Sequence, residues 1–257
     1  HILLFPSTPT ECFEMTADCF DLADRFQTPV IMMSDLDLGM NFHMTPPLQW
    51  DDERTYDLGK VYTAEDLENM GEYGRYLDSD DDGICYRTIP GTHPTKGSFF
   101  TRGTPRDEYA RYTESGEVYV RVVNRLLKKW FTARQYVPQP ELYQEGYRSS
   151  KGILFFGTTT YAALEAMDLL EAENMAMDAI RVRALPFNDT VEDFIAQHDE
   201  VFVIEQNRDA QFRTIIMNEL DTAPDKLIPI LNYDGMPITA KTIVEAIQNH
   251  LQVAARA

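Results

Sequence analysis

Cysteine is scarce in this sequence, which contains only Cys12, Cys19 and Cys85 among 257 residues. An odd and sparse count is typical of a reducing compartment and argues against a disulfide framework, so we expect a cytoplasmic protein. Three thiols also exclude an iron–sulfur cluster that is held by four cysteines of this chain. Long apolar runs are lacking as well, and none reaches the roughly 18 residues that a membrane-spanning helix needs.

Basic residues are few relative to acidic ones. Lys and Arg number 23 against 42 Asp and Glu, which gives a formal net charge of −19. Such a chain would meet like charge on nucleic acid or on an anionic membrane, so we expect neither as a partner. The hydrophobic fraction of 44% is that of a globular protein and argues against wholesale disorder.

The first 40 residues predict a β-α-β unit. Apolar strands are expected at 1–5 and 30–33, and Thr8 and Glu11 fit a capping box at the start of the helix between them. Continuous apolar strands are typical of a parallel sheet that is covered on both faces. A unit of this size buries too little to stand alone, and the sequence has no initiator methionine. We therefore expect the C-terminal portion of a longer subunit, with an unusual starting point as the alternative.

Residues 41–149 predict a long connecting segment. They hold most of the Tyr and Gly residues and show little periodicity before residue 107, which is typical of a segment that wraps over other elements. One helix is expected over 117–135, with an apolar stripe and a basic remainder. This helix is either packed with a solvated face or docked on an acidic partner surface. Its basic residues are Arg121, Arg125, Lys128, Lys129 and Arg134.

Residues 150–257 alternate regularly between strands and helices, which predicts a small doubly wound α/β domain. Strands are expected at 153–156, 180–184, 201–205 and 227–231, and helices at 161–172, 191–197, 210–220 and 240–251. Gly157 with three following threonines, and the segment 205–208, come directly after two of these strands, where such sheets bind ligands. Neither G-x-G-x-x-G nor G-K-[ST] is present, so helix capping and a polar turn are the alternative interpretations.

An acidic segment predicts a cation site. Asp78, Asp80 and Asp82 fall at alternate positions before Gly83, as in the first half of a calcium loop, and hard cations prefer this density of oxygen ligands. The closing Glu is missing, because Ile89 stands at its position. We predict that the three aspartates bind Ca²⁺ or Mg²⁺, with a solvated acidic turn as the alternative.

The segment 86–104 is unusually basic for this chain and is punctuated by Gly and Pro. It suits an anionic small substrate, with Arg87 or Arg102 as a bidentate carboxylate clamp and His93 beside them. The alternative is a structural loop whose arginines form ion pairs. We expect no catalytic residue in this chain, because no His pair has metal-ligand spacing and no Ser or Cys has an obvious activating partner.

Three blocks of the sequence carry a family likeness. They run from Ser7 to Asp35, from Asp82 to Tyr109 and from Val203 to Arg208, and the middle block contains the run Arg87-Thr88-Ile89-Pro90-Gly91-Thr92-His93. With these blocks the sequence resembles the α subunit of 2-oxoacid:ferredoxin oxidoreductases, closest to the 2-oxoglutarate type. The resemblance extends over essentially the whole chain.

The resemblance implies an α/β fold and an activity. Residues 1–40 would be the end of a thiamine-pyrimidine-type parallel-sheet domain, residues 41–149 a connecting segment with one amphipathic helix, and residues 150–257 a transketolase C-terminal-like doubly wound domain. The implied reaction depends on thiamine diphosphate and converts 2-oxoglutarate, CoA and oxidised ferredoxin to succinyl-CoA, CO₂ and reduced ferredoxin.

The resemblance also implies partners. A β subunit would hold most of the thiamine diphosphate, the Mg²⁺ and a [4Fe-4S] cluster. The upstream part of the α subunit would supply the acidic residue that contacts the aminopyrimidine and a Gly-Pro-Ser-Thr-Gly substrate motif, because both are absent here. This chain alone is therefore expected to be inactive. An alternative of a different class is a non-catalytic scaffold or interaction subunit of the same fold.

Overall fold

The structure is a computed structural model that describes residues 1–101, 105–143, 149–254 and 256. It divides into two compact units, each built from segments that are separated in the sequence. Unit 1 comprises His1–Ile2, Ala17–Val30 and Asp51–Tyr136, and unit 2 comprises Leu3–Thr16, Ile31–Trp50 and Val137–Ala257. These units do not coincide with the three consecutive segments expected from the sequence, because residues 1–40 and 41–149 each contribute to both units. The family domain boundaries stay a prediction.

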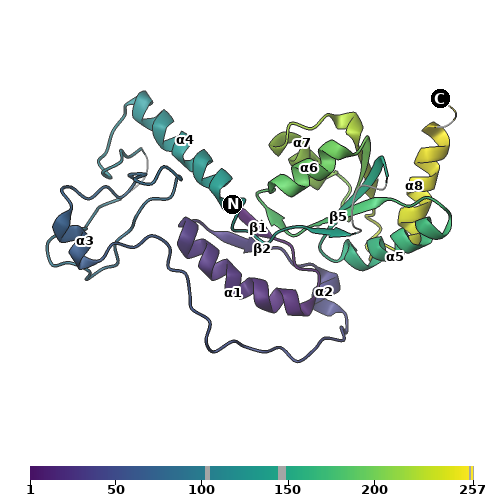
Figure 1. The fold of residues 1–257 in the computed structure, drawn as a ribbon, viewed down its shortest axis with the longest axis horizontal. Coiled ribbons are helices and arrows are strands. Elements are labelled where there is room, and N and C mark those ends of the chain that lie inside the picture. The colour runs from purple at the N-terminus through teal and green to yellow at the C-terminus, as the bar shows by residue number, and fades with distance from the viewer. Residues whose placement is uncertain (102–104, 144–148, 255, 257) are drawn as a thin grey trace. The chain divides into compact units, whose positions relative to one another are not determined.

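Unit 2 contains a mostly parallel sheet (Figure 1). Among the described residues, its strand order is β3-β5-β4-β7-β8. The strands are β3 (Glu141–Tyr143), β4 (Lys151–Phe156), β5 (Asp178–Val182), β7 (Glu200–Glu205) and β8 (Leu227–Leu231). The last four pair in parallel, and β3 pairs antiparallel with β5 at the edge. The parallel strands are those that the sequence predicts, whereas β3 was missed.

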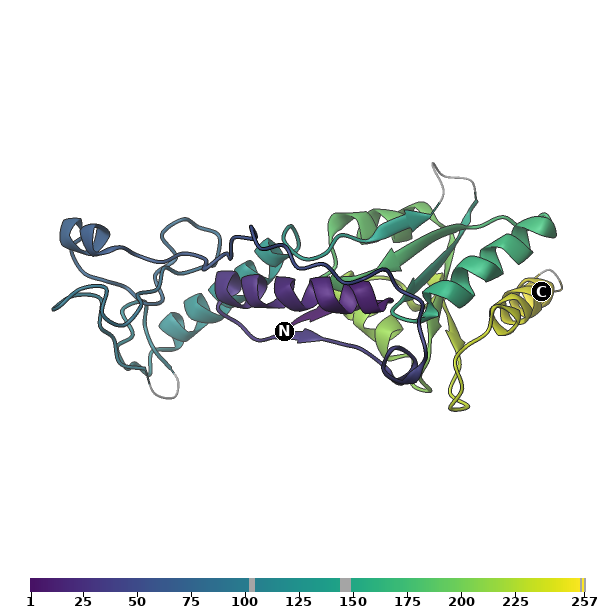
Figure 2. The ribbon, with the colours of Figure 1, turned by 90° about the horizontal axis from the view of Figure 1, so that it is seen from below.

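Helices cover this sheet from both sides. They are α5 (Thr159–Ala172), α6 (Asp189–Gln197), α7 (Gln211–Glu219) and α8 (Ala240–Ala254), with a short 3₁₀ turn η1 (Pro224–Lys226) before β8. α5 and α8 pack together on one face, and α6 and α7 lie on the other (Figure 2). Ile153 and Phe155 of β4 therefore enter the core beneath α5 and α8, while Gly152 lies against Phe194 of α6. The predicted α/β fold with a parallel sheet is confirmed.

A small second sheet places the N-terminal strand beside the C-terminal domain. Its strand order is β2-β1-β6, with β1 (Ile2–Leu4), β2 (Val30–Met32) and β6 (Ala184–Leu185). β1 is antiparallel to β6, with Leu4 opposite Ala184. The single strand predicted over 180–184 is therefore wrong in extent, because the chain leaves the large sheet after β5 and pairs with β1 instead. One neighbour that the N-terminal strand requires is thus supplied by this chain.

Unit 1 has few regular elements, as predicted for the connecting segment. It contains α3 (Ala64–Asn69), α4 (Gly116–Ala133) and the second half of α1 (Pro9–Phe26), whereas the short α2 (Leu36–Met40) belongs to unit 2. α4 is the helix that the sequence predicts over 117–135. Buried side chains are few in unit 1, and the loops are held partly by ion pairs such as Arg54 with Asp21 at 2.8 Å. In the described residues, no helix is both long and apolar enough to cross a membrane.

Candidate functional site

The candidate site of unit 2 lies where the strand order reverses. β4 leads through α5 to β5 on one side, whereas β7 lies on the other side of β4. A crevice forms outside the carboxyl ends of two such strands, and α/β sheets bind ligands there. Gly157 follows β4 with a φ of 60°, a left-handed conformation that favours glycine. Gln206 follows β7 directly, so the two segments noted in the sequence meet at this crevice.

Gln206 connects both sides of the crevice. Its amide nitrogen lies within hydrogen-bond distance of the hydroxyls of Thr158 at 3.3 Å and Thr159 at 3.4 Å, and its amide oxygen accepts from the N–H of Ile238 at 3.2 Å. The hydroxyl of Thr158 also donates to Asp35. Thr158 makes no side-chain capping bond to α5, so simple helix capping is not its role. The polar groups at the strand ends instead form a fixed network that faces the crevice.

A cavity of about 760 Å³ opens at this network, a volume typical of small-molecule sites. Its walls combine carboxylates, amides and apolar side chains, without a Lys or Arg among the described lining residues. The lining residues are Asp35, Leu36, Asp37, Met40, Asn41, Thr158, Gln206, Asn232, Tyr233, Gly235, Met236 and Pro237. A neutral or cationic polar ligand fits this environment better than an anion does.

Glu205 fixes the end of β7 and the start of α7. Its side chain is fully buried and accepts from the N–H groups of Phe212 at 2.8 Å and Arg213 at 2.9 Å. The amide of Asn207 donates to the same carboxylate at 2.7 Å. A buried carboxylate at a helix start satisfies N–H groups that have no partner within the helix. The segment 205–208 is therefore a hydrogen-bonded turn that fixes the position of Gln206.

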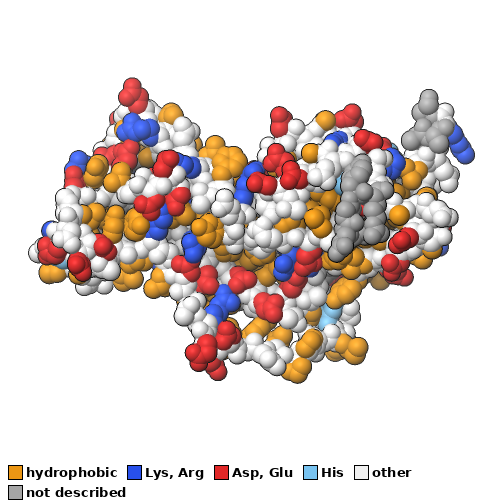
Figure 3. All heavy atoms as spheres, viewed as in Figure 1, with side chains coloured by type: hydrophobic (Ala, Val, Ile, Leu, Met, Phe, Trp, Pro, Cys, Tyr) orange, Lys and Arg blue, Asp and Glu red, His pale blue; other side chains and the backbone are white. Residues whose placement is uncertain are grey.

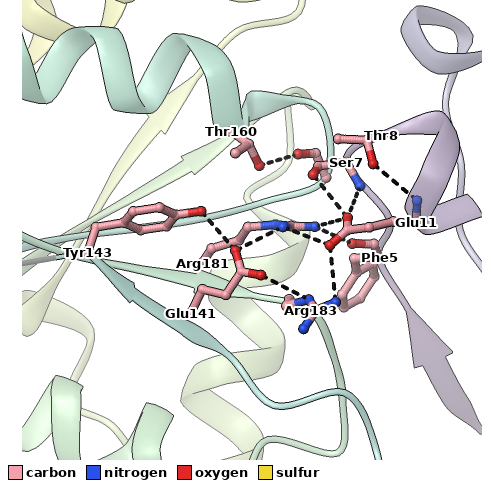
Figure 4. A network of polar contacts seen from close by, with 10 residues as sticks. Phe5, Ser7, Thr8, Glu11, Glu141, Tyr143, Thr160, Arg181 and Arg183 are labelled. Carbon is pink, nitrogen blue, oxygen red and sulfur yellow. Dashed lines mark hydrogen bonds and ion pairs between the residues drawn. The ribbon is translucent and has the colours of Figure 1, made fainter. Parts of the chain in front are cut away.

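A second polar cluster in unit 2 surrounds Arg181 (Figure 4). The Arg181 side chain is only 4% exposed. Its Nη1 donates to Glu11 at 3.0 Å and to Glu141 at 3.0 Å, and its Nη2 also contacts Glu11. Arg183 donates to Glu11 at 3.1 Å. Buried charges require such partners, because an unpaired ion in the interior is costly. The cluster joins the first turn of α1 to β5 and β3.

Glu11 is therefore engaged differently from a capping-box residue. Its N–H does donate to the Thr8 hydroxyl at 3.1 Å, but its carboxylate accepts from the N–H of Ser7 at 2.7 Å and from Arg181. Burial acts to raise the pKa of Glu11, and the hydrogen bonds from Arg181 and Ser7 outweigh burial and lower that pKa below its ordinary value of 4.5. The charged form of Glu11 thus stabilises the contact between α1 and Arg181 of β5.

The structure gives Arg87 and His93 partners within unit 1. Arg87 donates to Asp24 at 2.8 Å and to the carbonyl of Leu58 at 2.8 Å. His93 lies 2.6 Å from Glu68 through Nε2, while its Nδ1 accepts from two loop N–H groups, at 3.1 and 2.9 Å. Nε2 must then carry the proton that is donated to Glu68. These contacts support a structural loop for both residues, and Arg102 lies outside the described residues.

Two of the three predicted aspartate ligands have a lysine as their counter-ion. Lys60 Nζ lies 2.6 Å from Asp80 and 2.8 Å from Asp82. Asp78 accepts from the backbone N–H groups of Asp82 at 3.1 Å and Gly83 at 2.9 Å. In the described parts of the chain, no group of three His, Cys, Asp or Glu side chains is arranged to hold a metal ion. This arrangement supports a turn held by Lys60, and the Ca²⁺ or Mg²⁺ site stays a prediction.

Comparisons with known proteins agree along the length of the chain, although no protein-family model matches. The chain is 25% identical over 256 residues to 2-oxoacid:ferredoxin oxidoreductase 2, subunit alpha, of Aeropyrum pernix, which covers 98% of this chain and 38% of that protein. It is 25% identical over 261 residues to the 2-oxoacid:ferredoxin oxidoreductase subunit alpha of Saccharolobus solfataricus, which covers 100% of this chain and 40% of that protein. The chain is thus similar over its whole length to 2-oxoacid:ferredoxin oxidoreductase α subunits.

A solved structure agrees with these α subunits. The 2-oxoglutarate:ferredoxin oxidoreductase from Magnetococcus marinus, with 2-oxoglutarate, coenzyme A and succinyl-CoA bound, matches 96% of this chain with a TM-score of 0.82 and 24% identity, over 42% of that protein's chain. This likeness shows a shared fold. The chain spans about two fifths of the length of the curated α subunits that it matches.

Sequence reasoning missed three residues that organise these sites: Arg181, Lys60 and Asp35. For Arg181 a signal was available, because Arg181 and Arg183 alternate with apolar residues within a strand that was predicted for the interior of the domain. Such a charge demands a carboxylate partner, although the sequence does not say which one. Lys60 contacts Asp80, 20 residues away, and Asp35 contacts Thr158, 123 residues away. No local sequence pattern predicts either contact.

Proposed function

We propose that this chain is part of the α subunit of a thiamine-diphosphate-dependent 2-oxoglutarate:ferredoxin oxidoreductase. The reaction converts 2-oxoglutarate, CoA and oxidised ferredoxin to succinyl-CoA, CO₂ and reduced ferredoxin. The observation that carries the proposal is the extent of the likeness, 98% of the chain in sequence and 96% in structure. The choice of 2-oxoglutarate is supported by the matched structure, which is named for that substrate and holds it together with CoA and succinyl-CoA.

The proposal assigns the residue segments to family domains. Residues 1–40 form the end of a pyrimidine-type domain, residues 41–149 a connecting segment, and residues 150–257 a transketolase C-terminal-like domain. The C-terminal assignment is supported by the doubly wound sheet of β4, β5, β7 and β8. Upstream residues of the same subunit complete the pyrimidine-type domain.

Partner chains belong to the proposal. Large apolar side chains are exposed on the described surface (Figure 3), and Leu36, Met40, Phe42 and Met44 of unit 2 are each at least 77% exposed. Clustered apolar side chains of this kind mark interaction surfaces. A β subunit and the rest of the α subunit would cover such surfaces, and ferredoxin would accept the electrons. A cytoplasmic location is proposed on the sparse cysteine count.

The residues of this chain do not fit the redox and metal groups of the reaction. Three cysteines cannot ligate a four-thiolate cluster, and the described residues offer no three-ligand metal cluster. The proposal therefore gives thiamine diphosphate, Mg²⁺ and the [4Fe-4S] cluster mainly to the β subunit. This chain contributes structure and substrate contacts.

Arg102 is the residue of this chain that we propose for contact with a substrate or CoA anion. Arg87 and His93, which were predicted together with it, have Asp24 and Glu68 as partners, so Arg102 is the first of the three to test. A hydrogen bond between a charged arginine and an anion contributes about 1.5–3 kcal/mol. Removing Arg102 should then raise an apparent KM roughly ten- to hundredfold.

The test is an assay of the complete α–β complex with a ferredoxin or a viologen dye as electron acceptor. Dye reduction should require both 2-oxoglutarate and CoA, be slower with pyruvate, and be absent with this 257-residue chain alone. The variant Arg102→Ala should raise KM for 2-oxoglutarate or CoA, and Arg102→Lys should recover it only in part. Arg208→Ala is the matched control, because its guanidinium is exposed and pairs with Asp209. If the cofactor-loaded complex fails to reduce the dye with any 2-oxoacid tested, the scaffold alternative is established.

A further inference from the structure

The basic residues of α4 fall into two sets. Arg121 and Lys128 form ion pairs with carboxylates. Arg125 and Lys129 instead donate to backbone carbonyls, at 2.8 and 2.7 Å, and pair with no carboxylate in the described residues. The second set is four residues apart and therefore shares one face of the helix, where like charges destabilise each other. In a chain of net charge −19, two cations without an acidic partner require an explanation.

A third cation joins this face across a small cavity. The cavity has a volume of about 150 Å³ and is lined by Phe26, Gln27, Arg75, Tyr76, Ile84, Cys85, Arg125, Leu126 and Lys129. The guanidinium of Arg75 lies 5.3 Å from the ring centre of Tyr76 and 5.3 Å from that of Phe99. It forms no ion pair within the parts of the chain that the structure describes. Three cations and no carboxylate thus line one cavity.

The cavity is built by a close approach of backbone to backbone. Gly83 has a φ of 81°, and a Cβ there would lie 2.3 Å from the backbone nitrogen of Lys129. The loop after Gly83 can therefore lie directly on α4, which glycine alone permits. The hydroxyl of Thr132 donates to the carbonyl of Asp82 at 2.7 Å, and Gln27 donates to the carbonyl of Cys85 at 2.5 Å. These bonds fix the walls before any ligand binds.

The charges at this cavity repel one another. Burial, together with the positive charges of Arg125 and Arg75, lowers the pKa of Lys129 to about 8. Lys129 is still mainly protonated at neutral pH, so an anion between the three side chains would relieve the repulsion and restore the ordinary pKa. Other basic side chains of unit 1, such as Arg54 and Lys60, already have acidic partners.

We propose that this cavity binds a phosphate group between Arg75, Arg125 and Lys129. A cavity of about 150 Å³ accommodates a molecule the size of benzene, so a tetrahedral oxyanion fits and a whole nucleotide does not. Two guanidinium groups offer paired N–H donors that match phosphate oxygens, and the ammonium adds a point charge. The phosphate comes either from the free ion or from a larger phosphate monoester whose remaining atoms lie outside the cavity.

The first test is isothermal titration calorimetry of the 257-residue chain with inorganic phosphate and with glycerol phosphate, at matched ionic strength. We expect saturable binding of phosphate, and the variants Arg75→Gln and Arg125→Gln should each weaken it about tenfold or more. The control Arg121→Gln lies on the same helix, is already ion-paired and should bind as the wild type does. Stronger binding of the monoester would identify a larger ligand, and stronger binding of the free ion would identify phosphate itself.

The second measurement needs no variant. Phosphate should raise the pKa of Lys129, observed by NMR of its side-chain nitrogen, and chloride at the same ionic strength should not. The proposal is overturned if the pKa of Lys129 is the same in both salts, or if Arg121→Gln weakens phosphate binding as much as Arg125→Gln does. Neither measurement depends on turnover, so the result is independent of the proposed oxidoreductase activity.

Discussion

Replacing Arg181 by Met should destabilise unit 2 more than any exposed arginine replacement does. The side chain is 4% exposed and donates to Glu11 and Glu141 at 3.0 Å each, and Met retains its unbranched stem without the charged guanidinium. Removing one partner of a buried ion pair costs about 3–5 kcal/mol. Because Ser7 and Arg183 still donate to Glu11, we expect the lower end, about 3 kcal/mol.

This loss is large enough to measure by thermal unfolding. About 3 kcal/mol corresponds to a Tm lower by about 6–12 °C for a chain of this size. Adding Glu11→Gln to Arg181→Met should recover part of the loss, since the stranded carboxylate is then neutral and the two substitutions are coupled. The control Arg208→Met alters a side chain that is 74% exposed and should change stability by less than about 0.5 kcal/mol. A Tm for Arg181→Met within about 2 °C of the wild type would refute the reasoning.

Three further predictions concern titration and ion binding. The pKa of Glu11 is lowered in the folded state, so its stabilising contribution is present above its ordinary value of 4.5 and lost as pH falls through the lower folded value; urea unfolding of Glu11→Gln should lack this acid-side loss. The pKa of Lys129 is about 8 in the folded state against an ordinary value of 10.5, so between these pH values the folded state binds fewer protons than the unfolded state. The free energy of unfolding should therefore increase as pH rises through this window, and Lys129→Met should remove that increase. Calcium at millimolar concentration should leave the wild-type Tm unchanged, because Lys60 neutralises Asp80 and Asp82. The variant Lys60→Met should instead show a Tm that rises with calcium concentration. A calcium-dependent rise in the wild-type Tm would establish the cation site.

Local patterns predicted the parallel strands of the large sheet, although not its edge strand β3. β4, β7 and β8 are continuous apolar runs followed by helical stripes, and each is recognisable from its own residues because both faces of the strand are covered. The small sheet could not be predicted in this way. β6 contains only Ala184 and Leu185, and it exists because β1 pairs with it across 180 residues.

The position of Gln206 at a strand end was predicted, but its contacts were not. Gln206 was expected at the carboxyl end of a strand because strand ends follow from periodicity. Its bonds to Thr158 and Ile238 depend on how three strand ends meet, which no local pattern encodes. The partner of Arg87 was not predictable for a related reason: it is Asp24, 63 residues earlier in the chain. The ligand contact of the basic loop stays a prediction.

The pairing of β1 with β6 has a consequence for how the chain folds during synthesis. Leu4 and Ala184 meet in this sheet, so about 180 residues must emerge before the first strand acquires that partner. Closing so long a loop has a substantial entropic cost, and contacts of such separation slow folding. Until then the edge of strand Ile2–Leu4 that pairs with β6 remains unpaired, and unpaired strand edges make nascent chains prone to aggregate or to recruit chaperones. Ribosome-bound chains that end before residue 184 should therefore bind a chaperone. Chains that end after residue 220 should release it.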